Sequence, residues 1–276
     1  MQSLGIDVDA KTSTGCLLDE AGEVKSRGPI ETSSMELQRL CREQRGSGEL
    51  IAGQEVGGMA YLVRDALAQA GVPLLSFNAQ QMRMIAASRK KTDRRDAYWI
   101  GRSLQSGMHP HPVYLPSGLI RELRARLAQR SALQSEQQRW WLRARALLRS
   151  LGLRTGSGTR ALLQALDGLR TRESIPAYLQ ESAALYHRQI VALGTELRRA
   201  DRALHQATQS VDAIQRLQCI PGIRRLSAST LLAWIGEIDR FPSARSLCAY
   251  EGWFLAFAKA GRRTTWGGSP RPAQAL

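Results

Sequence analysis

Short apolar runs separated by turns dominate the first 90 residues of the chain. They predict five strands, at 3–9, 15–18, 24–30, 49–56 and 72–77. Helical spacing of apolar positions predicts three helices between and after these strands, at 34–44, 59–70 and 79–89. Turns join the first three strands, whereas helices alternate with the later ones. We therefore expect an α/β fold, with a mixed sheet covered by helices.

The pattern changes to long helices after residue 117. Residues 117–151 form one helical stretch, and a second extends from about 176 to 208, beyond a Gly/Ser-rich linker at 155–159. Apolar residues recur along the second helix at near-helical spacing, at Leu179, Leu185, Ile190, Leu193, Leu197 and Leu204. Two long helices in succession favour an antiparallel hairpin or a dimerising coiled coil, with this stripe as its core or its dimer interface.

Charge is distributed unevenly along the chain and indicates a polyanionic partner. The 276 residues carry a formal charge of +15. Residues 1–80 hold 7 basic and 11 acidic side chains, whereas residues 81–276 hold 32 basic and 13 acidic ones. A well-solvated helical surface is also rich in arginine, but this excess is larger than solubility requires. We therefore expect the basic part of the chain to bind nucleic acid.

Several other classes of protein are excluded. No apolar run reaches the roughly 18 residues that a membrane-spanning helix needs. The first residues have neither the basic segment nor the long apolar segment of a secretory signal. The four cysteines are scattered without a CxxC pair, which excludes a conventional zinc finger and gives no sign of a disulfide framework. We expect a cytoplasmic protein that does not interact with a membrane.

Four acidic residues form the candidate catalytic site. Asp7 lies at the end of the first predicted strand and Glu55 at the end of the fourth. Asp93 and Asp96 lie three residues apart, so they share one face of a helix that Thr92 can cap. Close carboxylates repel one another unless a cation bridges them, and four of them fit a Mg²⁺ site for in-line phosphodiester displacement. For Asp93 and Asp96 alone, charge compensation at a helix N-terminus is the simpler explanation.

Glycines lie next to the two strand-end acids. Gly5 precedes Asp7 by two residues, Gly53 precedes Glu55 by two, and Gly57 follows Glu55 by two. A glycine has no side chain, so another group can approach its backbone closely. We expect these glycines to give a substrate access to the acids.

The motifs resemble those of the DEDD transposases, the Piv/MooV-type recombinases with a RuvC-like domain. The resemblance rests on the order of G-I-D at 5–7, an apolar strand that ends in Glu55, and K-T-D-R-R-D-A at 91–97. It continues in four segments that are similar to the start of the family's C-terminal transposase domain, I-P-G-I at 220–223, L-L-A-W-I-G-E-I at 231–238, R-F-P-S-A at 240–244 and A-Y-E-G at 249–252. Motifs in this order span residues 3–252 and predict membership of the family.

The resemblance implies both an architecture and an activity. It implies a RuvC/RNase H-like catalytic domain at 1–112, a long helical linker or dimerisation region at 113–210, and a partial helical C-terminal domain at 211–276. The activity is DNA transposition or recombination, with Mg²⁺ held by Asp7, Glu55, Asp93 and Asp96. The expected partners are DNA, a structured guide RNA from the element, and further copies of the chain in a dimer or tetramer.

Basic residues in three segments, together with one glycine, are candidate nucleic-acid contacts. They are Lys90, Lys91, Arg94 and Arg95 beside the acids, Arg121, Arg124, Arg139 and Arg143 on the first long helix, and Gly222, Arg224 and Arg225 near residue 222. The segment at 220–223 is typical of a helix-hairpin-helix turn, whose free backbone N–H groups can hold a phosphate. An ordinary Pro-Gly turn explains the same residues equally well.

The resemblance weakens after residue 252. The family implies a serine nucleophile in an S-G pair, preceded by L-x-P, but this chain has Ala260-Gly261 and Trp253-Phe254-Leu255 at those places. Reading the codons one base earlier permits L-V-P, S-G and G-G-I-T-K at the expected positions. We therefore predict a tail that is frameshifted from about residue 253 and a truncated C-terminal domain without its serine nucleophile. A genuinely divergent tail is the alternative.

Two other functions are consistent with these residues. A Mg²⁺-dependent RuvC-like nuclease would use the acids to activate water and nick DNA, and the Asp7→Ala substitution would abolish nicking. A non-catalytic nucleic-acid-binding remnant would bind DNA in a salt-dependent manner that survives loss of the acids.

Overall fold

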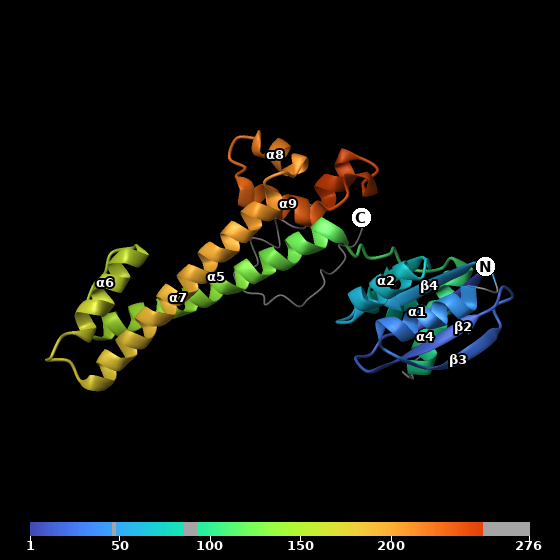
Figure 1. Ribbon diagram of the computed structural model, residues 1–276, viewed down its shortest axis with the longest axis horizontal. Coiled ribbons are helices and arrows are strands. Elements are labelled where there is room, and N and C mark those ends of the chain that lie inside the picture. The colour runs from blue at the N-terminus through green and yellow to red at the C-terminus, as the bar shows by residue number, and fades with distance from the viewer. Residues whose placement is uncertain (46–47, 86–92, 251–276) are drawn as a thin grey trace. The chain divides into compact units, whose positions relative to one another are not determined.

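The computed structural model describes residues 1–45, 48–85 and 93–250, and it describes side chains over these ranges except at 83–85 and 93–95. The chain divides into two compact units, Met1–Leu115 and a second that begins at Pro116 (Figure 1). No helix within the described ranges is long and apolar enough to cross a membrane.

The first unit is built on a mixed five-stranded sheet. Its strands are β1 (Gln2–Asp7), β2 (Thr12–Leu18), β3 (Val24–Glu31), β4 (Leu50–Glu55) and β5 (Leu74–Phe77). They lie in the order β3-β2-β1-β4-β5. The first three strands pair antiparallel, whereas β4 pairs parallel with both β1 and β5. The predicted α/β class with a mixed sheet is therefore confirmed.

Helices cover both faces of this sheet. On one face, α1 (Ser34–Arg45) and α2 (Ala60–Gln69) enclose a core that includes Leu4 and Ile6 of β1. On the other face, α4 (Asp93–Ser106) packs against β1, β2 and β4. A shorter helix, α3 (Ala79–Ile85), follows β5. Because successive side chains of a strand point to opposite faces, Gly5 and Asp7 lie on the face that α4 covers.

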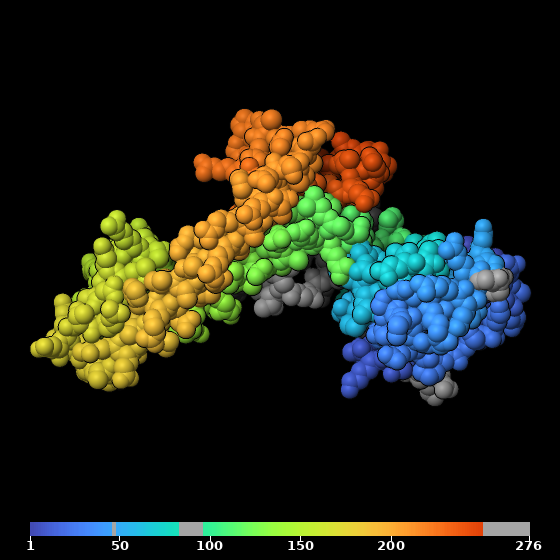
Figure 2. Space-filling model, viewed as in Figure 1, coloured from blue at the N-terminus to red at the C-terminus, as the bar shows by residue number. Residues whose placement is uncertain are grey.

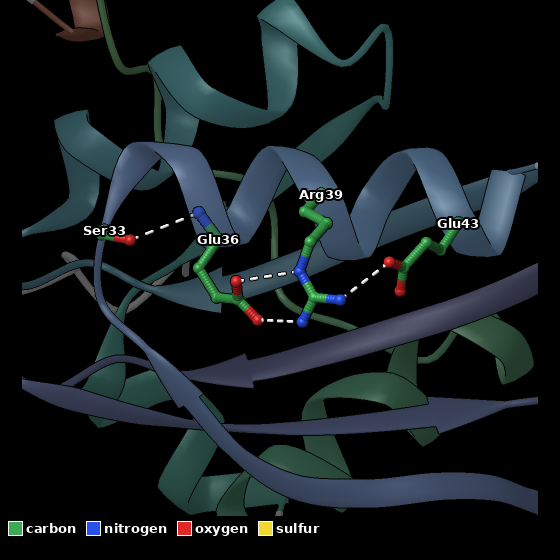
Figure 3. Close-up of polar contacts among 4 residues, drawn as sticks. All are labelled: Ser33, Glu36, Arg39 and Glu43. Atoms are coloured by element: carbon green, nitrogen blue, oxygen red, sulfur yellow. Dashed lines mark hydrogen bonds and ion pairs between the residues drawn. The ribbon is translucent and has the colours of Figure 1, made fainter.

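Local sequence explains where α1 begins. Ser33 Oγ accepts a hydrogen bond from the Glu36 backbone N–H at 3.3 Å, which satisfies one of the unpaired donors of the first turn. Figure 3 shows Arg39 between Glu36 and Glu43, with its Nη1 2.8 Å from Glu43 Oε1. The hydrogen bond from Arg39 lowers the pKa of the Glu36 carboxyl group. These groups are solvated, so α1 is held mainly by the buried side chains of its inner face.

The second unit is helical in its described part. It contains α5 (Gly118–Ser150), α6 (Thr159–Arg170), α7 (Ala177–Thr208), α8 (Asp212–Gln218), α9 (Arg225–Ile235) and the short 3₁₀-helix η1 (Ile238–Arg240). The two long helices α5 and α7 lie side by side (Figure 2). Arg130 Nε lies 2.5 Å from Asp201 Oδ1, and Gln137 Nε2 donates to the Ile190 carbonyl at 3.3 Å. The helices are therefore antiparallel, and the predicted hairpin is the arrangement found within the chain.

Two separate cores hold this hairpin. One includes Leu162 and Leu166 of α6 together with Leu148 and Ile190 of the long helices. The other joins α5 and α7 to α8 and α9. The helices α8 and α9 therefore pack with one end of the long hairpin, and the predicted domain division near residue 210 stays a prediction. The predicted stripe on α7 is buried at Ile190 and Leu204 but exposed at Leu185, so only part of it lies in these cores.

The sequence pattern predicts no helix over 159–170, where the structure has α6. Leu162, Leu166 and Leu169 are buried and recur at helical spacing. The helix is only 12 residues long and directly follows the Gly/Ser-rich segment. Its stability comes from packing against α5 and α7, and this tertiary contribution is not visible in the local pattern.

Candidate catalytic and nucleic-acid-binding sites

Asp7 and Glu55 end two neighbouring strands of the first unit. The parallel strands β1 and β4 pair with Ile6 opposite Gln54, so both strands end at the same edge of the sheet. Neighbouring strands lie about 4.8 Å apart. Both acids follow, by two residues, a glycine on the α4 face, and both are half-buried. Their carboxylates therefore leave adjacent strands on one face of the sheet.

The N-terminal part of α4 lies toward the same edge. At the other end of α4, Gln105 Nε2 donates to the Asp19 carbonyl at 2.9 Å, beyond the end of β2. That end of β2 pairs with the start of β1, so it lies away from Asp7. Asp96, one residue before Ala97, is half-buried in the N-terminal half of α4. Asp93 is the first residue of α4, and its side chain lies outside the described part of the chain.

The structure brings together only part of the predicted set of four ligands. Among the side chains that the structure describes, no group of three or more His, Cys, Asp or Glu residues lies close enough to hold a metal ion. Mg²⁺ in proteins commonly takes one or two carboxylates together with water and phosphate oxygens. The adjacent pair of Asp7 and Glu55 fits that donor set, whereas the complete four-acid site stays a prediction.

The glycines before the acids do not face a substrate. A Cβ at Gly5 would lie 1.9 Å from the Ala97 carbonyl oxygen, and one at Gly53 would lie 2.8 Å from Ile100 Cγ2. The expectation that these two glycines admit a substrate is therefore wrong, because α4 occupies that space. Gly57, in the exposed turn after Glu55, has no atom within 4 Å of a Cβ built on it.

Gln54 supports the end of β4, although the sequence pattern does not single it out. It is fully buried, and its Nε2 donates to the Ala60 carbonyl and to Ser76 Oγ, each at 3.0 Å. These bonds tie the strand end to α2 and to β5, and so fix the backbone that carries Glu55. The available signal is a lone polar residue in a buried strand, directly before an acid.

The candidate contacts next to Asp93 and Asp96 lie largely outside the described part of the chain. Lys90 and Lys91 fall in the undescribed segment before α4. Arg94 and Arg95 belong to the first turn of α4, but their side chains are among those not described. Their predicted contact with nucleic acid stays a prediction.

Arg124 has a structural role that its sequence context conceals. Its Nε donates to the Ala233 carbonyl at 2.7 Å, and its Nη2 donates to the Trp234 carbonyl at 3.4 Å. Its guanidinium also lies 5.3 Å from the centre of the Trp234 ring. The side chain thus binds the last carbonyls of α9 and joins that helix to α5. A phosphate contact would compete with these bonds.

The other candidate arginines of α5 differ in exposure. Arg139 is exposed and paired with Glu136 on its own helix. Arg143 is also exposed and lies 4.8 Å from the centre of the Trp140 ring. Arg121 is half-buried near the start of the helix. Arg139 and Arg143 are therefore the two whose charge is best placed to meet a solvent-side polyanion.

The predicted hairpin turn joins α8 to α9. Gly222 has a φ of +87°, in the left-handed region that favours glycine, and Ile223 N–H donates to the Ile220 carbonyl at 3.1 Å. Arg224 is exposed immediately before α9, and Arg225 is half-buried at its first position. Two packed helices joined by a short turn fit the helix-hairpin-helix geometry. Phosphate binding by this turn stays a prediction.

Adjacent acids at one end of a mixed sheet, together with an arginine-rich helical unit, are the arrangement expected of an enzyme that acts on nucleic-acid strands. Comparison with known families gives the particular family. The DEDD transposase model of the IS110 type matches residues 4–152, more than half of the chain, and the model described as "Transposase IS116/IS110/IS902 family" matches residues 214–271. The chain belongs to this family of insertion-sequence transposases, which confirms the predicted membership.

Individual proteins match this chain only at low sequence identity. The transposase for insertion sequence element IS1111A of Coxiella burnetii is 24% identical over 263 residues, which cover 90% of this chain and 67% of the relative. Thermus thermophilus RuvC, solved in complex with a Holliday junction substrate, is 15% identical and has a TM-score of 0.32. That match covers 41% of this chain and 99% of the RuvC chain. A second RuvC structure from the same organism has a TM-score of 0.30.

The C-terminal tail is where the family resemblance implies a serine nucleophile and where this chain is predicted to lack one. The second family model matches as far as residue 271, beyond the predicted frameshift at about residue 253. Residues 251–276 lie outside the described residues. The frameshift, the truncation and the missing serine therefore stay predictions.

Proposed function

We propose that this insertion-sequence transposase cuts DNA at the acids that end β1 and β4, together with Asp93 and Asp96 of α4. The observation that carries the proposal is the adjacency of Asp7 and Glu55 on parallel strands, on the face that α4 covers. Carboxylates that share an edge in this way repel one another unless a cation lies between them. A divalent cation both relieves that repulsion and binds a phosphate, which suits phosphodiester chemistry.

The chain's own residues would hold and orient the reacting groups. Backbone pairing of β1 with β4 fixes the spacing of the two strand-end carboxylates. The buried Gln54 amide restrains the backbone at Glu55. Mg²⁺, when bound, supplies Lewis-acid stabilisation of the charge that develops on the phosphate. Partial burial of the acids strengthens their attraction for a cation relative to the same groups in water.

The partners follow from charge and from the family. We propose that four arginines contact DNA or RNA phosphates: Arg139, Arg143, Arg224 and Arg225. The excess of basic residues beyond residue 80 supports this proposal. A structured guide RNA and a homo-oligomer, a dimer or a tetramer, belong to the same proposal and are supported by family membership. The cytoplasm is the proposed site of action.

Mg²⁺-dependent nicking is a second candidate function. One observation favours it: the paired acids lie in the unit Met1–Leu115, which has its own sheet and core. If the tail lacks the serine, the acids would still be able to activate water at a phosphate. The DNA sequence of the locus decides between a shifted frame and a divergent tail, because only a shift reads through L-V-P, S-G and G-G-I-T-K.

The test compares strand-end acids in the full-length protein. We expect Asp7→Asn and Glu55→Gln to lower Mg²⁺-dependent cleavage of end-labelled element DNA by about 100-fold or more, because each removes a cation ligand. The matched control is Glu31→Gln, which alters an exposed acid at the end of the outer strand β3. Cleavage that survives both acid substitutions, with folding unchanged, would refute the proposed site. Nicked product without joined product would favour the nuclease.

A further inference from the structure

Glycines line the contact between α4 and the sheet. Gly5 of β1 lies opposite Gly53 of β4 in the parallel register. Gly101 of α4 faces Gly5, and a Cβ at Gly101 would lie 3.3 Å from the Gly5 backbone nitrogen. The backbones of α4 and β1 therefore approach each other more closely than any residue with a side chain would permit.

The contact at Gly5 is the tightest. A Cβ at this position would lie 1.9 Å from the Ala97 carbonyl oxygen and 2.5 Å from the Gly101 nitrogen. Both are backbone atoms of α4, so no rotation of a side chain can relieve the overlap. At Gly53 the nearest atoms are instead side-chain atoms of α4, Ile100 Cγ2 at 2.8 Å and Leu104 Cδ1 at 2.9 Å. Leu104 Cδ1 ends a flexible side chain and can move, whereas Ile100 Cγ2 is bonded to a stiff β-branched Cβ, so the overlap at Gly53 is relieved only in part without movement of the helix.

This contact lies directly beside the candidate acids. On the sheet, Asp7 follows Gly5 by two residues and shares its face. On the helix, Asp96 precedes Ala97, and Asp93 lies one turn earlier. Any change in the separation of α4 from β1 at Gly5 therefore changes the distance between the acids of the helix and the acids of the strands.

We propose that Gly5, with Gly53 and Gly101, is a positioning residue for the acid site: it sets α4 at the distance from β1 that lets carboxylates of both elements share one divalent cation. The inference rests on the proposed function, because it presumes that the four acids bind that cation. The glycines themselves touch neither substrate nor metal.

The preference of the site for Mg²⁺ over Ca²⁺ separates a positioning role from a purely structural one, because a loss of packing alone would not change this preference. Mg²⁺ requires near-ideal octahedral geometry with oxygens at about 2.0–2.1 Å, whereas Ca²⁺ accepts 6–8 oxygens at about 2.3–2.6 Å in flexible arrangements. A shift of α4 by about 1 Å, the least that would relieve the Gly5→Ala overlap, is large compared with the tolerance of a Mg²⁺ site. The same shift should harm Ca²⁺ binding less.

Four alanine substitutions form a graded series. Gly5→Ala places a methyl group against helix backbone at 1.9 Å, Gly53→Ala places one against α4 side chains at 2.8 and 2.9 Å, and Gly101→Ala places one at 3.3–3.4 Å from its nearest neighbours. Gly28→Ala is the matched control, because Gly28 lies in the same sheet and has no atom within 4 Å of a Cβ built on it.

The experiment is calorimetric titration of the full-length protein with Mg²⁺ and, separately, with Ca²⁺, with thermal unfolding of each metal-free variant measured in parallel. We expect Gly5→Ala to weaken Mg²⁺ binding more than about tenfold and Ca²⁺ binding clearly less. Gly53→Ala and Gly101→Ala should show smaller reductions with the same preference, and Gly28→Ala should show none. Wild-type Mg²⁺ affinity in folded Gly5→Ala, or equal reductions for both cations, would overturn the inference.

A replacement is needed if Gly5→Ala does not fold. Gly101→Ala and Gly53→Ala then take its place, and unchanged Mg²⁺ affinity in both overturns the inference.

Asp7→Asn in the same titration separates this inference from the proposed function. If Asp7→Asn retains wild-type Mg²⁺ binding, the acid site itself is refuted. If Asp7→Asn abolishes binding while Gly5→Ala retains it, only the positioning role fails.

Discussion

The two units of this transposase use their charged residues in different ways. In the sheet unit, Asp7 and Glu55 are placed by the backbone, because the parallel register of β1 and β4 brings the strand ends together. In the helical unit, arginines recur along α5 at positions that fall on several faces of the helix. What each arginine does there depends on the helix that packs against it. The role of a strand-end acid can therefore be predicted from its position in the sequence, whereas the role of a helical arginine depends on which helix packs against it.

The units also differ in how their cores are arranged. The main core of the sheet unit lies between the sheet and α1 and α2. The helical unit instead has a core toward each end of the α5–α7 hairpin. Between those cores the hairpin is joined by polar contacts, such as Arg130 with Asp201. Arg124, which sequence alone assigns to nucleic acid, likewise holds the fold, because it donates to carbonyls of α9.

The strongest test of this difference is Arg124→Met, which keeps an apolar stem and removes the guanidinium. We expect a decrease of about 1–3 kcal/mol in the free energy of unfolding, because the carbonyls of Ala233 and Trp234 are deprived of a charged donor. Urea denaturation followed by helical circular dichroism measures this decrease.

Arg126→Met is the matched control for Arg124→Met. Arg126 lies on the same helix and pairs with exposed Glu122 at 2.7 Å. Its removal should change the unfolding free energy by about 0.5 kcal/mol or less. Equal stability of the two variants, combined with weaker DNA binding by Arg124→Met, would contradict the structural role and restore Arg124 as a phosphate contact.

A smaller effect is expected at the exposed arginines of α5. The double substitution Arg139→Gln and Arg143→Gln should leave stability nearly unchanged and weaken DNA binding several-fold. The slope of log affinity against log salt should become shallower by about 1 for each phosphate that the variant no longer neutralises. Arg199→Gln on α7 is the control, since Arg199 is paired with Glu196 as Arg139 is with Glu136. The same change of slope in Arg199→Gln would contradict a specific role for Arg139 and Arg143, because DNA would then contact α5 and α7 alike.

Much of the sheet unit is predictable from sequence because strands, turns and strand-end acids are local features. The apolar runs define all five strands, and the acids follow from where those runs end. The role of Gly5 is not predictable in this way. A sequence shows that a side chain is missing but not which element fills the space, and here that element is α4, about 90 residues later in the chain.

The helical unit is less predictable for the same physical reason. Arg124 and Arg126 look alike in sequence, yet Arg124 binds the end of α9 whereas Arg126 pairs with Glu122 on its own helix. The helix α6 carries its leucines at helical spacing, but 12 residues are too few to form a stable helix alone, so contacts with α5 and α7 stabilise it. Tertiary packing decides both outcomes.

The thiols give the mildest test of the contrast between the units. Cys41 is buried in the core of the sheet unit, and burial raises the pKa of its thiol to about 11, whereas Cys219 of the helical unit is exposed. At pH 8 we expect a thiol reagent to modify Cys219 rapidly and Cys41 only after urea unfolds the protein. Because the folded state disfavours the Cys41 thiolate, its contribution to stability is complete below about pH 9 and disappears as the pH rises toward about 11. A Cys41→Ser variant lacks this thiol, so a stability that falls equally in the variant and in the wild type over that pH range would assign the fall to other groups.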